Sequence, residues 1–372
     1  MRVLVVNTGS SSVKLSVVGH GGETSGATTL GPPGDEATDR DIVAYVTGAE
    51  AIDVVGHRIV HGGAEFHEPV VIDAAVRRGL DAVAALAPVH MPPALRLIDL
   101  LTAHVDVPQV ACFDTAFHAW LPLAAATYAI PERWRELGVR RYGFHGLSCA
   151  WSLRRAAVML ALEPSDLRVC VAHLGAGASV SAIREGHSVD TSMGFTPLEG
   201  LVMATRSGSV DPGALMWLQT SRGVGAEGMS DQLEHASGVH ALTGTGDMGE
   251  VLRRAGSGDA AAALARDVYV HSVAAHIAGV ATSLDRLDAL VFTGGVGENA
   301  GEIRDLTCSR LGVIGVQRPA RQPQTGVDSV ISGDGAAIAV LVIHAREDLE
   351  IAREIRAMPD LPARAPRIDT AH

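Results

Sequence analysis

The 372-residue sequence has almost no lysine: Lys14 is the single one, and the other 29 of its 30 basic residues are arginine. This bias favours a specific need for the compact, flexible ammonium at position 14, although a leftover surface lysine is the simpler alternative. Acidic residues outnumber basic ones, which gives a formal net charge of −12. That balance argues against a general nucleic-acid binder, which usually has a basic surface.

Cysteine is scarce as well. The four cysteines, Cys112, Cys149, Cys170 and Cys308, lie far apart and form no CxxC pair, which argues against a zinc site and a disulfide framework. No apolar stretch approaches the ~20 residues of a membrane span, and the N-terminus has no basic region, apolar signal core or cleavage site. These absences predict a soluble cytoplasmic protein with no membrane partner.

The remaining composition is that of a globular protein, with 47% hydrophobic and 19% charged residues, and the length predicts two domains. Strands alternate with helices, which is typical of α/β layers with largely parallel sheets. We predict a surface loop over 19–40 and a charged, exposed segment over 132–141. Predicted strands cover 3–6, 13–18, 52–63, 107–117, 168–183 (with a glycine-rich turn), 288–299 and 336–345. Predicted helices cover 73–87, 259–284 (with Asp259 as N-cap) and 347–358.

Two strand-turn-strand segments resemble each other: VLVVNTGSSSVKLSVV (3–18) and VCVAHLGAGASVSAI (169–183). Their likeness suggests two similar domains, each with a turn of the size that holds a phosphate. The first turn lacks the order GxxxxGK[ST] and is followed by period-two alternation, so it is a hairpin tip and not a Walker A loop. Its three serines supply donors that favour phosphate binding over a plain turn.

The longer motifs resemble the acetate kinase (acetokinase) family of the acetate and sugar kinase, Hsc70 and actin superfamily. They follow the family's order over nearly the whole chain. The motifs are NTGSSSVK (7–14), VGHRIVHGG (55–63), LAPVHMPP (86–93), FDTAFH (113–118), RRYGFHG (140–146), HLGAGAS (173–179), DTSMGFTPLEGL (190–201), TRSGSVDPG (205–213), VFTGGVGEN (291–299) and EDLEIARE (347–354).

The resemblance implies two actin-like (ribonuclease H-like) domains, each a mixed sheet flanked by helices, with the active site in the cleft between them. The domains would cover 1–117, with the C-terminal helix 350–372 packing on it, and 118–349, which would bind the nucleotide. It also implies a homodimer, in which the 259–284 helix is a candidate participant.

The implied reaction is ATP-dependent phosphorylation of acetate to acetyl phosphate by direct in-line transfer, with Mg²⁺ (or Mn²⁺) as cofactor. A carboxylate is already ionised at pH 7, so the nucleophile needs no general base, and the site must instead neutralise and align two anions. Two alternatives stay open: a propionate or butyrate kinase, and a catalytically weak nucleotide-binding member of the superfamily.

The resemblance also assigns residues to roles. Asp114, His145 and Arg206 would be catalytic, with Asp114 acting as a base, orienting an arginine or ordering the metal's water shell. Arg58 would bind the substrate carboxylate, and Asn7 and Glu347 the metal. The acyl pocket would be formed by Val60, Val89, His90, Phe144 and Pro197. The nucleotide would be bound by Ser10, Ser12, Lys14, His173, Leu174, Gly175, Ala176, Gly177, Asp247, Met248, Gly249, Gly295, Val296, Gly297, Glu298 and Asn299.

Taken one at a time, these residues have ordinary structural interpretations. The arginines fit surface ion pairs, the histidines fit hydrogen-bonded core positions, Asp114 fits a helix cap, and the glycines of 294–299 fit a turn. Only their joint occurrence in order favours the functional interpretation.

The sequence departs from the family pattern in several places. Met91 replaces asparagine in HNP, 146–149 read GLSC for GTSH, and Ser209 replaces aspartate in SGD. Ala176 replaces asparagine in HLGNG, and Gly249 replaces an arginine after DM. Arg346 stands beside the predicted metal ligand Glu347. The nucleotide side is changed most, which predicts weaker ATP affinity or an altered nucleotide preference. Val89, where leucine is usual, predicts that propionate is accepted alongside acetate.

Overall fold

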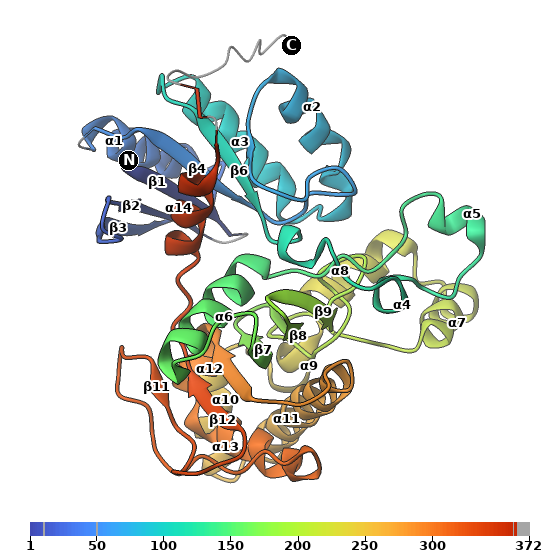
Figure 1. The fold of residues 1–372 in the computed structure, drawn as a ribbon. Coiled ribbons are helices and arrows are strands. Elements are labelled where there is room, and N and C mark those ends of the chain that lie inside the picture. The colour runs from blue at the N-terminus through green and yellow to red at the C-terminus, as the bar shows by residue number, and fades with distance from the viewer. Residues whose placement is uncertain (10–11, 50, 360, 363–372) are drawn as a thin grey trace. The chain divides into compact units, whose positions relative to one another are not determined.

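The structure is a computed structural model that describes residues 1–9, 12–49, 51–359 and 361–362. The chain divides into two compact units (Figure 1). Unit 1 comprises Met1–Ala119, Phe144–Leu147 and the C-terminal part of the chain from Arg346, and unit 2 comprises Trp120–Gly143 and Ser148–Ala345. Compactness alone does not show which segments fold together, so the domain boundaries drawn from the sequence stay a prediction.

Unit 1 is built on a six-stranded mixed sheet in the order β3-β2-β1-β4-β6-β5. The first three strands form antiparallel pairs, β1, β4 and β6 run parallel, and β5 pairs antiparallel with β6. The strands are β1 (Val3–Thr8), β2 (Val13–Val18), β3 (Thr24–Leu30), β4 (Val54–Ile59), β5 (Val70–Val71) and β6 (Gln109–Phe113). The helices are α1 (Glu36–Gly48), α2 (Ala74–Ala82), α3 (Met91–Thr102) and α14 (Glu347–Ala357), with short 3₁₀ turns at Ala84–Leu86 and Ala116–His118.

Both faces of this sheet are covered, which explains why its central strands begin as runs of buried apolar residues; their polar residues, such as Asn7 and Arg58, lie towards the carboxyl ends. Alternate residues of β1 point to opposite faces. Val3 and Val5 pack in a core cluster with Ile351 and Ile355 of α14. The intervening residues of β1 pack on the other side with residues of α1 and α3. The carboxyl ends of β1, β4 and β6 are thereby held at one edge between two packed layers.

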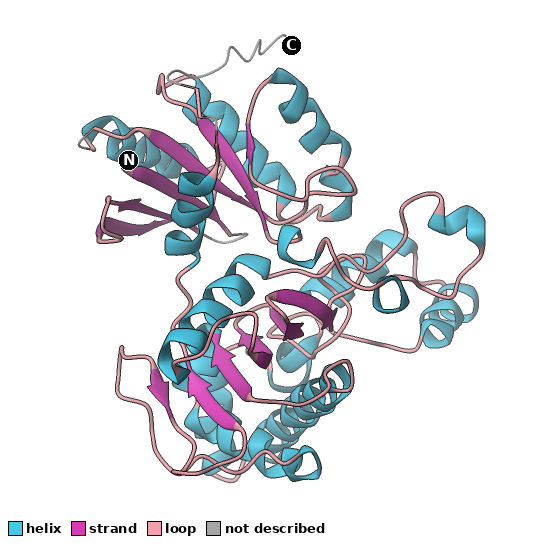
Figure 2. Ribbon diagram, in the orientation of Figure 1, coloured by secondary structure: helices cyan, strands magenta, loops and turns pink. Residues whose placement is uncertain are grey.

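Unit 2 repeats the plan with a sheet in the order β11-β12-β10-β7-β8-β9. Read from the other end, this is the order of the first sheet: an antiparallel three-strand meander, two further parallel strands and a short antiparallel edge strand. The strands, drawn in magenta in Figure 2, are β7 (Arg168–Leu174), β8 (Ala178–Arg184), β9 (His187–Thr191), β10 (Ala289–Thr293), β11 (Ser329–Val330) and β12 (Ala339–Val342). The expectation of two similar α/β domains with mixed sheets is confirmed.

The helices of unit 2 vary widely in length. The longest, α11 (Ala260–Ala281), begins at the predicted cap, because the Asp259 side chain accepts hydrogen bonds from the N–H groups of Ala261 and Ala262. The others are α4 (Leu123–Ala126), α5 (Glu132–Arg135), α6 (Gly146–Leu160), α7 (Pro212–Arg222), α8 (Ala226–His235), α9 (Gly238–Thr243), α10 (Met248–Gly256), α12 (Gly294–Asn299) and α13 (Gly301–Arg310), with a 3₁₀ turn at Leu311–Ile314.

Two sequence expectations about elements are wrong. Residues 19–40 are not all loop, since they contain β3 and the start of α1. The side chains of β3 are largely exposed at the sheet edge, so the strand shows no apolar alternation. Residues 288–299 are not all strand: β10 ends at Thr293 and α12 follows. Gly294 makes this change of direction, with a φ of 78° at a point where a Cβ would lie 2.8 Å from the Leu174 carbonyl oxygen.

Within the described ranges, no helix combines the length and the apolar character that crossing a membrane requires.

Candidate functional site

The densest group of predicted site residues lies at the carboxyl edge of the unit 1 sheet. Arg58, near the end of β4, makes two-pronged contact with the Asp114 carboxylate, with 3.1 Å from Nε and 2.6 Å from Nη2 to Oδ2. Its Nη1 donates to the Asn7 amide oxygen at 3.0 Å and lies 3.8 Å from a Glu347 oxygen. Asn7 and Arg58 are register partners on β1 and β4, so the sheet itself brings them together. Four residues predicted on separate motifs therefore form one cluster.

Burial dominates the electrostatics of this cluster. The Asp114 side chain is 1% exposed and that of Arg58 is 16% exposed. Burial raises the pKa of the Asp114 carboxyl to about 6, and the Arg58 guanidinium opposes that rise. For Arg58, burial lowers the pKa, but the two carboxylates outweigh it and raise the pKa overall. The guanidinium is therefore permanently charged, and the pair is ionised at pH 7. The contacts favour Asp114 as the group that orients Arg58 over its interpretation as a helix cap.

The predicted metal ligands lie against each other in the same cluster. The Asn7 side-chain N–H donates to a Glu347 carboxylate oxygen at 2.7 Å. Glu347 is the first residue of α14, which carries further acidic residues in its first turn. One carboxylate and one amide oxygen are hard donors of the kind that Mg²⁺ takes, with water and substrate phosphates completing its shell. The residues present fit this ion. No described group of three or more His, Cys, Asp or Glu residues could hold a metal on its own.

Arg346, the departure beside the metal ligand, has its own partners. Its Nε donates to Asp348 Oδ1 at 3.0 Å, and its Nη2 donates to Asp348 Oδ2 at 3.1 Å and to Thr24 Oγ1 at 2.7 Å. Thr24 in turn donates to Asp348 at 3.3 Å. The positive charge next to Glu347 is therefore balanced by the following acidic residue, which sequence analysis did not foresee.

The loop that carries His145 returns to unit 1 beside Asp114. His145 has a φ of 58°, uncommon for a residue with a Cβ, and the next N–H, of Gly146, donates to the Asp114 carbonyl at 2.9 Å. The preceding residue, Phe144, is 1% exposed. Its carbonyl accepts from His118 Nε2 at 3.0 Å, and its ring meets the edge of His61 with centroids 5.3 Å apart. Backbone strain at His145 is thus held by contacts on both sides of it.

The other predicted acyl-pocket residues of unit 1 lie in two places. Val60 follows β4 and is 7% exposed, whereas Val89 and His90 are half-buried just before α3. His90 is the N-cap residue of α3 without a side-chain cap. Buried Pro197 belongs to unit 2.

The first predicted phosphate loop is described in part. Ser10 lies outside the described residues. Ser12 is half-buried, and Lys14 is exposed on β2 as the register partner of Asn7. The phosphate-binding hypothesis for this tip stays a prediction.

The second predicted phosphate loop joins β7 to β8 in unit 2. His173 is 8% exposed, and its Nδ1 lies 2.8 Å from the Ser148 hydroxyl. Across the turn, the Gly175 N–H donates to the Gly177 carbonyl at 3.0 Å. The carbonyl of Ala176 accepts from the Ala204 N–H at 3.2 Å, so the loop is tied to the segment that leads to Arg206.

The predicted nucleotide residues 294–299 form α12, next to the same loop. The Glu298 carboxylate accepts from the N–H groups of Gly294 and Ala345, both at 2.9 Å. The Asn299 side chain donates to the Gly295 carbonyl at 2.9 Å. Glu298 is therefore tied to the backbone of its own helix and of the segment after β12. Val296 and Gly297 complete this helix.

The third predicted nucleotide segment is the start of α10. Asp247 is its N-cap and accepts from the N–H of Gly249 at 2.8 Å, followed in the helix by buried Met248. A Cβ at Gly249 would meet only the Asp247 carboxylate, at 3.2 Å. The glycine at this position is therefore not demanded by packing.

Arg206 lies in the loop after β9. Its Nε pairs with Glu234 Oε2 at 3.0 Å, and its Nη1 donates to the Pro197 carbonyl at 3.4 Å. Burial lowers the pKa of the Arg206 guanidinium, and the Glu234 charge opposes this. Unit 2 thus brings one predicted catalytic residue together with one predicted pocket residue.

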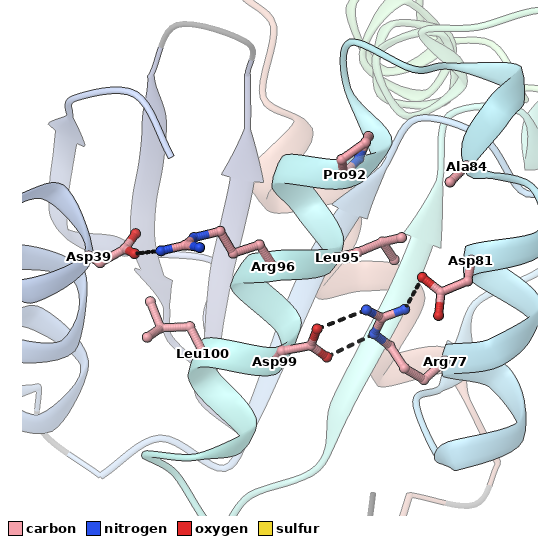
Figure 3. Close-up of a pocket in the computed structure, with 9 residues that line it drawn as sticks. All are labelled: Asp39, Arg77, Asp81, Ala84, Pro92, Leu95, Arg96, Asp99 and Leu100. Atoms are coloured by element: carbon pink, nitrogen blue, oxygen red, sulfur yellow. Dashed lines mark hydrogen bonds and ion pairs between the residues drawn. The ribbon is translucent and has the colours of Figure 1, made fainter. Parts of the chain in front are cut away.

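A separate pocket of about 610 Å³ lies in unit 1 among α1, α2 and α3 (Figure 3). Arg77 bridges Asp99 and Asp81 there, and Arg96 pairs with Asp39 at 2.6 Å. Its charged side chains satisfy one another, and none of the predicted site residues line it. The remaining lining residues are Ala84, Pro92, Leu95 and Leu100.

Sequence reasoning missed several residues that support the site: Glu234, Asp348, Thr24, His118 and His61. Asp348, His118 and His61 lie inside the quoted motifs, but no role was assigned to them there. Glu234 lies on a polar helix that gives no signal.

Comparison with known proteins gives one consistent result. A sequence model described as the acetokinase family matches residues 40–353. A protein from Nostoc punctiforme named acetate kinase is 46% identical over 305 residues, which are 81% of this chain and 75% of that protein. The crystal structure of Porphyromonas gingivalis acetate kinase superposes with a TM-score of 0.86 and 32% identity, covering 96% of this chain and 100% of that one. A propionate kinase from Francisella tularensis superposes with a TM-score of 0.86 and 35% identity, covering 95% and 98%.

Proposed function

The chain belongs to the acetokinase family, and from this premise we propose that it transfers the γ-phosphoryl group of ATP to acetate, giving acetyl phosphate and ADP. One observation carries the proposal: a buried arginine fork, Arg58, fixed by Asp114 among oxygen donors suited to Mg²⁺. A guanidinium fork matches a carboxylate, and its charge does not depend on pH over the working range.

In this proposal some residues bind the substrates and the metal, and others stabilise the charge that develops during transfer. Arg58 would bind the acetate carboxylate, and Asp114 would hold that arginine. Asn7 and Glu347 would hold Mg²⁺, which when bound neutralises charge on the nucleotide phosphates. Arg206 and His145 would stabilise the charge on the oxygens of the transferring group, which is the main task in phosphoryl transfer. The attacking acetate oxygen forms the new P–O bond as the bond to ADP breaks, and no proton moves.

The nucleotide side of the proposal rests on unit 2. His173, Leu174, Gly175, Ala176 and Gly177 would approach the phosphates. Asp247–Gly249 and Gly295–Asn299 would hold the nucleoside. Ala176 and Gly249 offer no polar side chain, which supports weak or relaxed nucleotide binding. Comparing KM for ATP, GTP and pyrophosphate checks this, and tight, exclusive use of ATP would contradict it.

Trapping the product with hydroxylamine tests the proposed reaction. The full chain, incubated with ATP, Mg²⁺ and acetate, is expected to give acetyl hydroxamate together with an equal amount of ADP. Arg58→Ala should lose most of this product. Arg96→Ala is the matched control, because Arg96 also pairs with an aspartate of unit 1 but lines the separate pocket. ADP formation without hydroxamate would mean ATP hydrolysis and would overturn the proposal.

Propionate is the second candidate substrate, favoured by Val89, which is one methylene smaller than the usual leucine. Val89→Leu should lower kcat/KM for propionate relative to acetate by ~10-fold or more, since one methylene is worth ~1–3 kcal/mol of discrimination. Val158→Leu, at a position 69% exposed, is the control. Equal change for both acids would refute the pocket assignment.

We also propose a homodimer, supported by large apolar side chains exposed on unit 2. Trp120 is 74% exposed, Leu123 79%, Leu137 78% and Met216 60%. Aromatic residues and methionine are enriched at protein contact surfaces relative to the rest of the protein surface. Sedimentation of the full chain measures the oligomeric state, and a monomer at micromolar concentration would contradict the proposal. The cytoplasmic location and the absence of nucleic-acid partners stay predictions.

A further inference from the structure

We propose that Glu234 is a positioning residue for Arg206, which holds the guanidinium in the orientation that phosphoryl transfer needs. The inference rests on the proposed function and deepens it, because Glu234 lies outside every motif that carried that function.

The contact is direct and largely shielded. Glu234 lies in the last turn of α8, and its Oε2 is 3.0 Å from Arg206 Nε. The two side chains are 16% and 14% exposed. An ion pair at this depth competes less with water than a surface pair and is screened less by salt. Glu234 therefore restricts the rotamers of an otherwise flexible side chain.

The backbone on both sides of the pair is fixed as well. The Thr205 hydroxyl donates to the Glu234 carbonyl at 2.9 Å, and the Ser207 N–H donates to the Leu233 carbonyl at 3.1 Å. The residues flanking Arg206 are thus hydrogen-bonded to the end of α8. The distance between the Cα atoms of the pair is set by these contacts, so the length of the acidic side chain decides whether it reaches Nε.

The start of α9 locks this arrangement from the other side. Gly238 has a φ of 63°, and a Cβ there would lie 2.2 Å from the Met203 carbonyl oxygen and 2.7 Å from that of Arg206. Only glycine fits so close to the arginine's own backbone. The Met203 N–H closes the turn by donating to the Arg206 carbonyl at 3.1 Å.

The nitrogen of Arg206 that Glu234 contacts determines which nitrogens can bind an oxyanion. Glu234 takes Nε, so an oxyanion bound by Arg206 must be held by the terminal nitrogens. Each terminal nitrogen carries two N–H groups, so Nη1 can donate both to the Pro197 carbonyl, at 3.4 Å, and to an oxygen of a phosphoryl group whose second oxygen Nη2 binds. Pre-orientation by a fixed partner avoids reorganisation in the transition state, which is where such stabilisation acts. A carboxylate at Nε also balances a buried positive charge that would be costly without a counter-ion.

Three variants of Glu234 test the proposal, because they separate the length of the side chain from its charge. Glu234→Ala should lower kcat by ~10–100-fold and change KM for acetate by less than ~3-fold. Glu234→Gln keeps an oxygen that accepts from Nε and should keep kcat within ~3-fold of wild type. Glu234→Asp keeps the charge but is one methylene too short and should lose ~5–10-fold. In an Arg206→Ala background, Glu234→Ala should cost nothing further.

The control is Glu302→Gln, which removes the charge of a unit 2 ion pair at the same 3.0 Å distance, with Arg266, and should leave kcat unchanged. If Glu234→Ala does not fold, the order of the other two variants decides: Gln above Asp supports positioning, and Asp at or above Gln overturns it. Unchanged kcat in Glu234→Ala, or a further loss in the Arg206→Ala background, overturns it while the proposed function stands. A wild type without acyl phosphate formation overturns both.

Discussion

The two sheets have the same strand order but carry different chemistry at equivalent positions. In the first sheet, Asn7 on β1 pairs with Arg58 on β4. In the second, His173 on β7 pairs with Thr293 on β10 at the corresponding place. The first row carries a guanidinium that contacts two carboxylates, whereas the second adjoins glycine-rich turns. The same strand order thus places a cluster of ion pairs at this edge in unit 1 and glycine-rich turns at the corresponding edge in unit 2.

The comparison also shows two ways of holding an arginine. Arg58 stands on a central strand, and its Nε and Nη2 both donate to the Asp114 carboxylate, which follows the neighbouring strand β6. Arg206 stands on a loop, and a helix residue holds it by one nitrogen. The two arginine side chains are similarly buried, at 16% and 14% exposed, but the carboxylate that holds Arg58 is 1% exposed, whereas the one that holds Arg206 is 16% exposed. Stability should depend on the first and turnover on the second.

The largest expected effect is on stability, from Asp114→Ala. Removing this carboxylate leaves the buried Arg58 charge without its main partner, so the free energy of unfolding should fall by ~3–5 kcal/mol. Urea denaturation measures it. Asp81→Ala, which removes a 58% exposed partner of Arg77, is the control and should cost less than ~1 kcal/mol. Similar losses of stability in both variants would mean that the buried Arg58–Asp114 pair stabilises the fold no more than the exposed Arg77–Asp81 pair does.

The next effect is on turnover, from Arg206→Ala. Loss of a fixed donor to the transferring group should lower kcat by ~10²–10³-fold, with a smaller fall in the urea midpoint than Arg58→Ala causes, because the Glu234 carboxylate left behind is less buried than that of Asp114. Arg58→Ala should instead raise KM for acetate and lower the urea midpoint. If Arg206→Ala is less stable than Arg58→Ala, the contrast drawn between these two arginines is wrong.

Acid should weaken unit 1 through two buried histidines. Burial lowers the pKa of His57 to about 4 and that of His118 to about 4. The unfolded chain binds these protons near pH 6.5 and the folded chain does not, so stability is full above pH 6.5 and is lost as pH falls towards 4. Over this range, each histidine should lower the free energy of unfolding by up to about 3 kcal/mol. His57→Gln should flatten the dependence measured by urea denaturation at successive pH values, and an unchanged slope would contradict this.

A smaller effect concerns metal binding beside Arg346. Asp348→Ala leaves the arginine charge uncompensated next to Glu347 and should raise the Mg²⁺ concentration for half-maximal activity by ~10-fold. Arg346→Ala should change it by less than ~3-fold, because Asp348 and Thr24 already hold that side chain. Magnesium titration of both variants checks the order. A larger effect from Arg346→Ala would mean that the arginine itself acts on the metal site.

Much of the fold was predictable from the sequence, because buried strands and capped helices have local signatures. The strand at 3–6 and the helix begun at Asp259 were of this kind. The edge strand β3 was not, since its exposed side chains leave no apolar period. The turn from β10 into α12 was missed because it depends on Gly294 passing the Leu174 carbonyl, a contact distant in sequence.

Prediction of the site from sequence has the same limit, because contacts between residues distant in the chain have no local signature. Arg58, Asp114 and Asn7 were predicted from motifs that end neighbouring strands, and the sheet brings them together. Glu234 could not be predicted, because its partner is 28 positions away and a glutamate on a short polar helix usually faces water. The sequence places Arg346 beside Glu347 but does not show its pairing with Asp348, which depends on the conformations of both side chains.

The position of α14 in the chain has a consequence for synthesis. This helix, which closes the core on one face of the first sheet, comes from beyond residue 345, whereas the strands it covers come from the first third of the chain. During synthesis, Val3 and Val5 cannot pack against Ile351 and Ile355 until nearly the whole chain has left the ribosome. Until then that face is a surface for chaperones to shield, and late truncations should harm the earliest strands most.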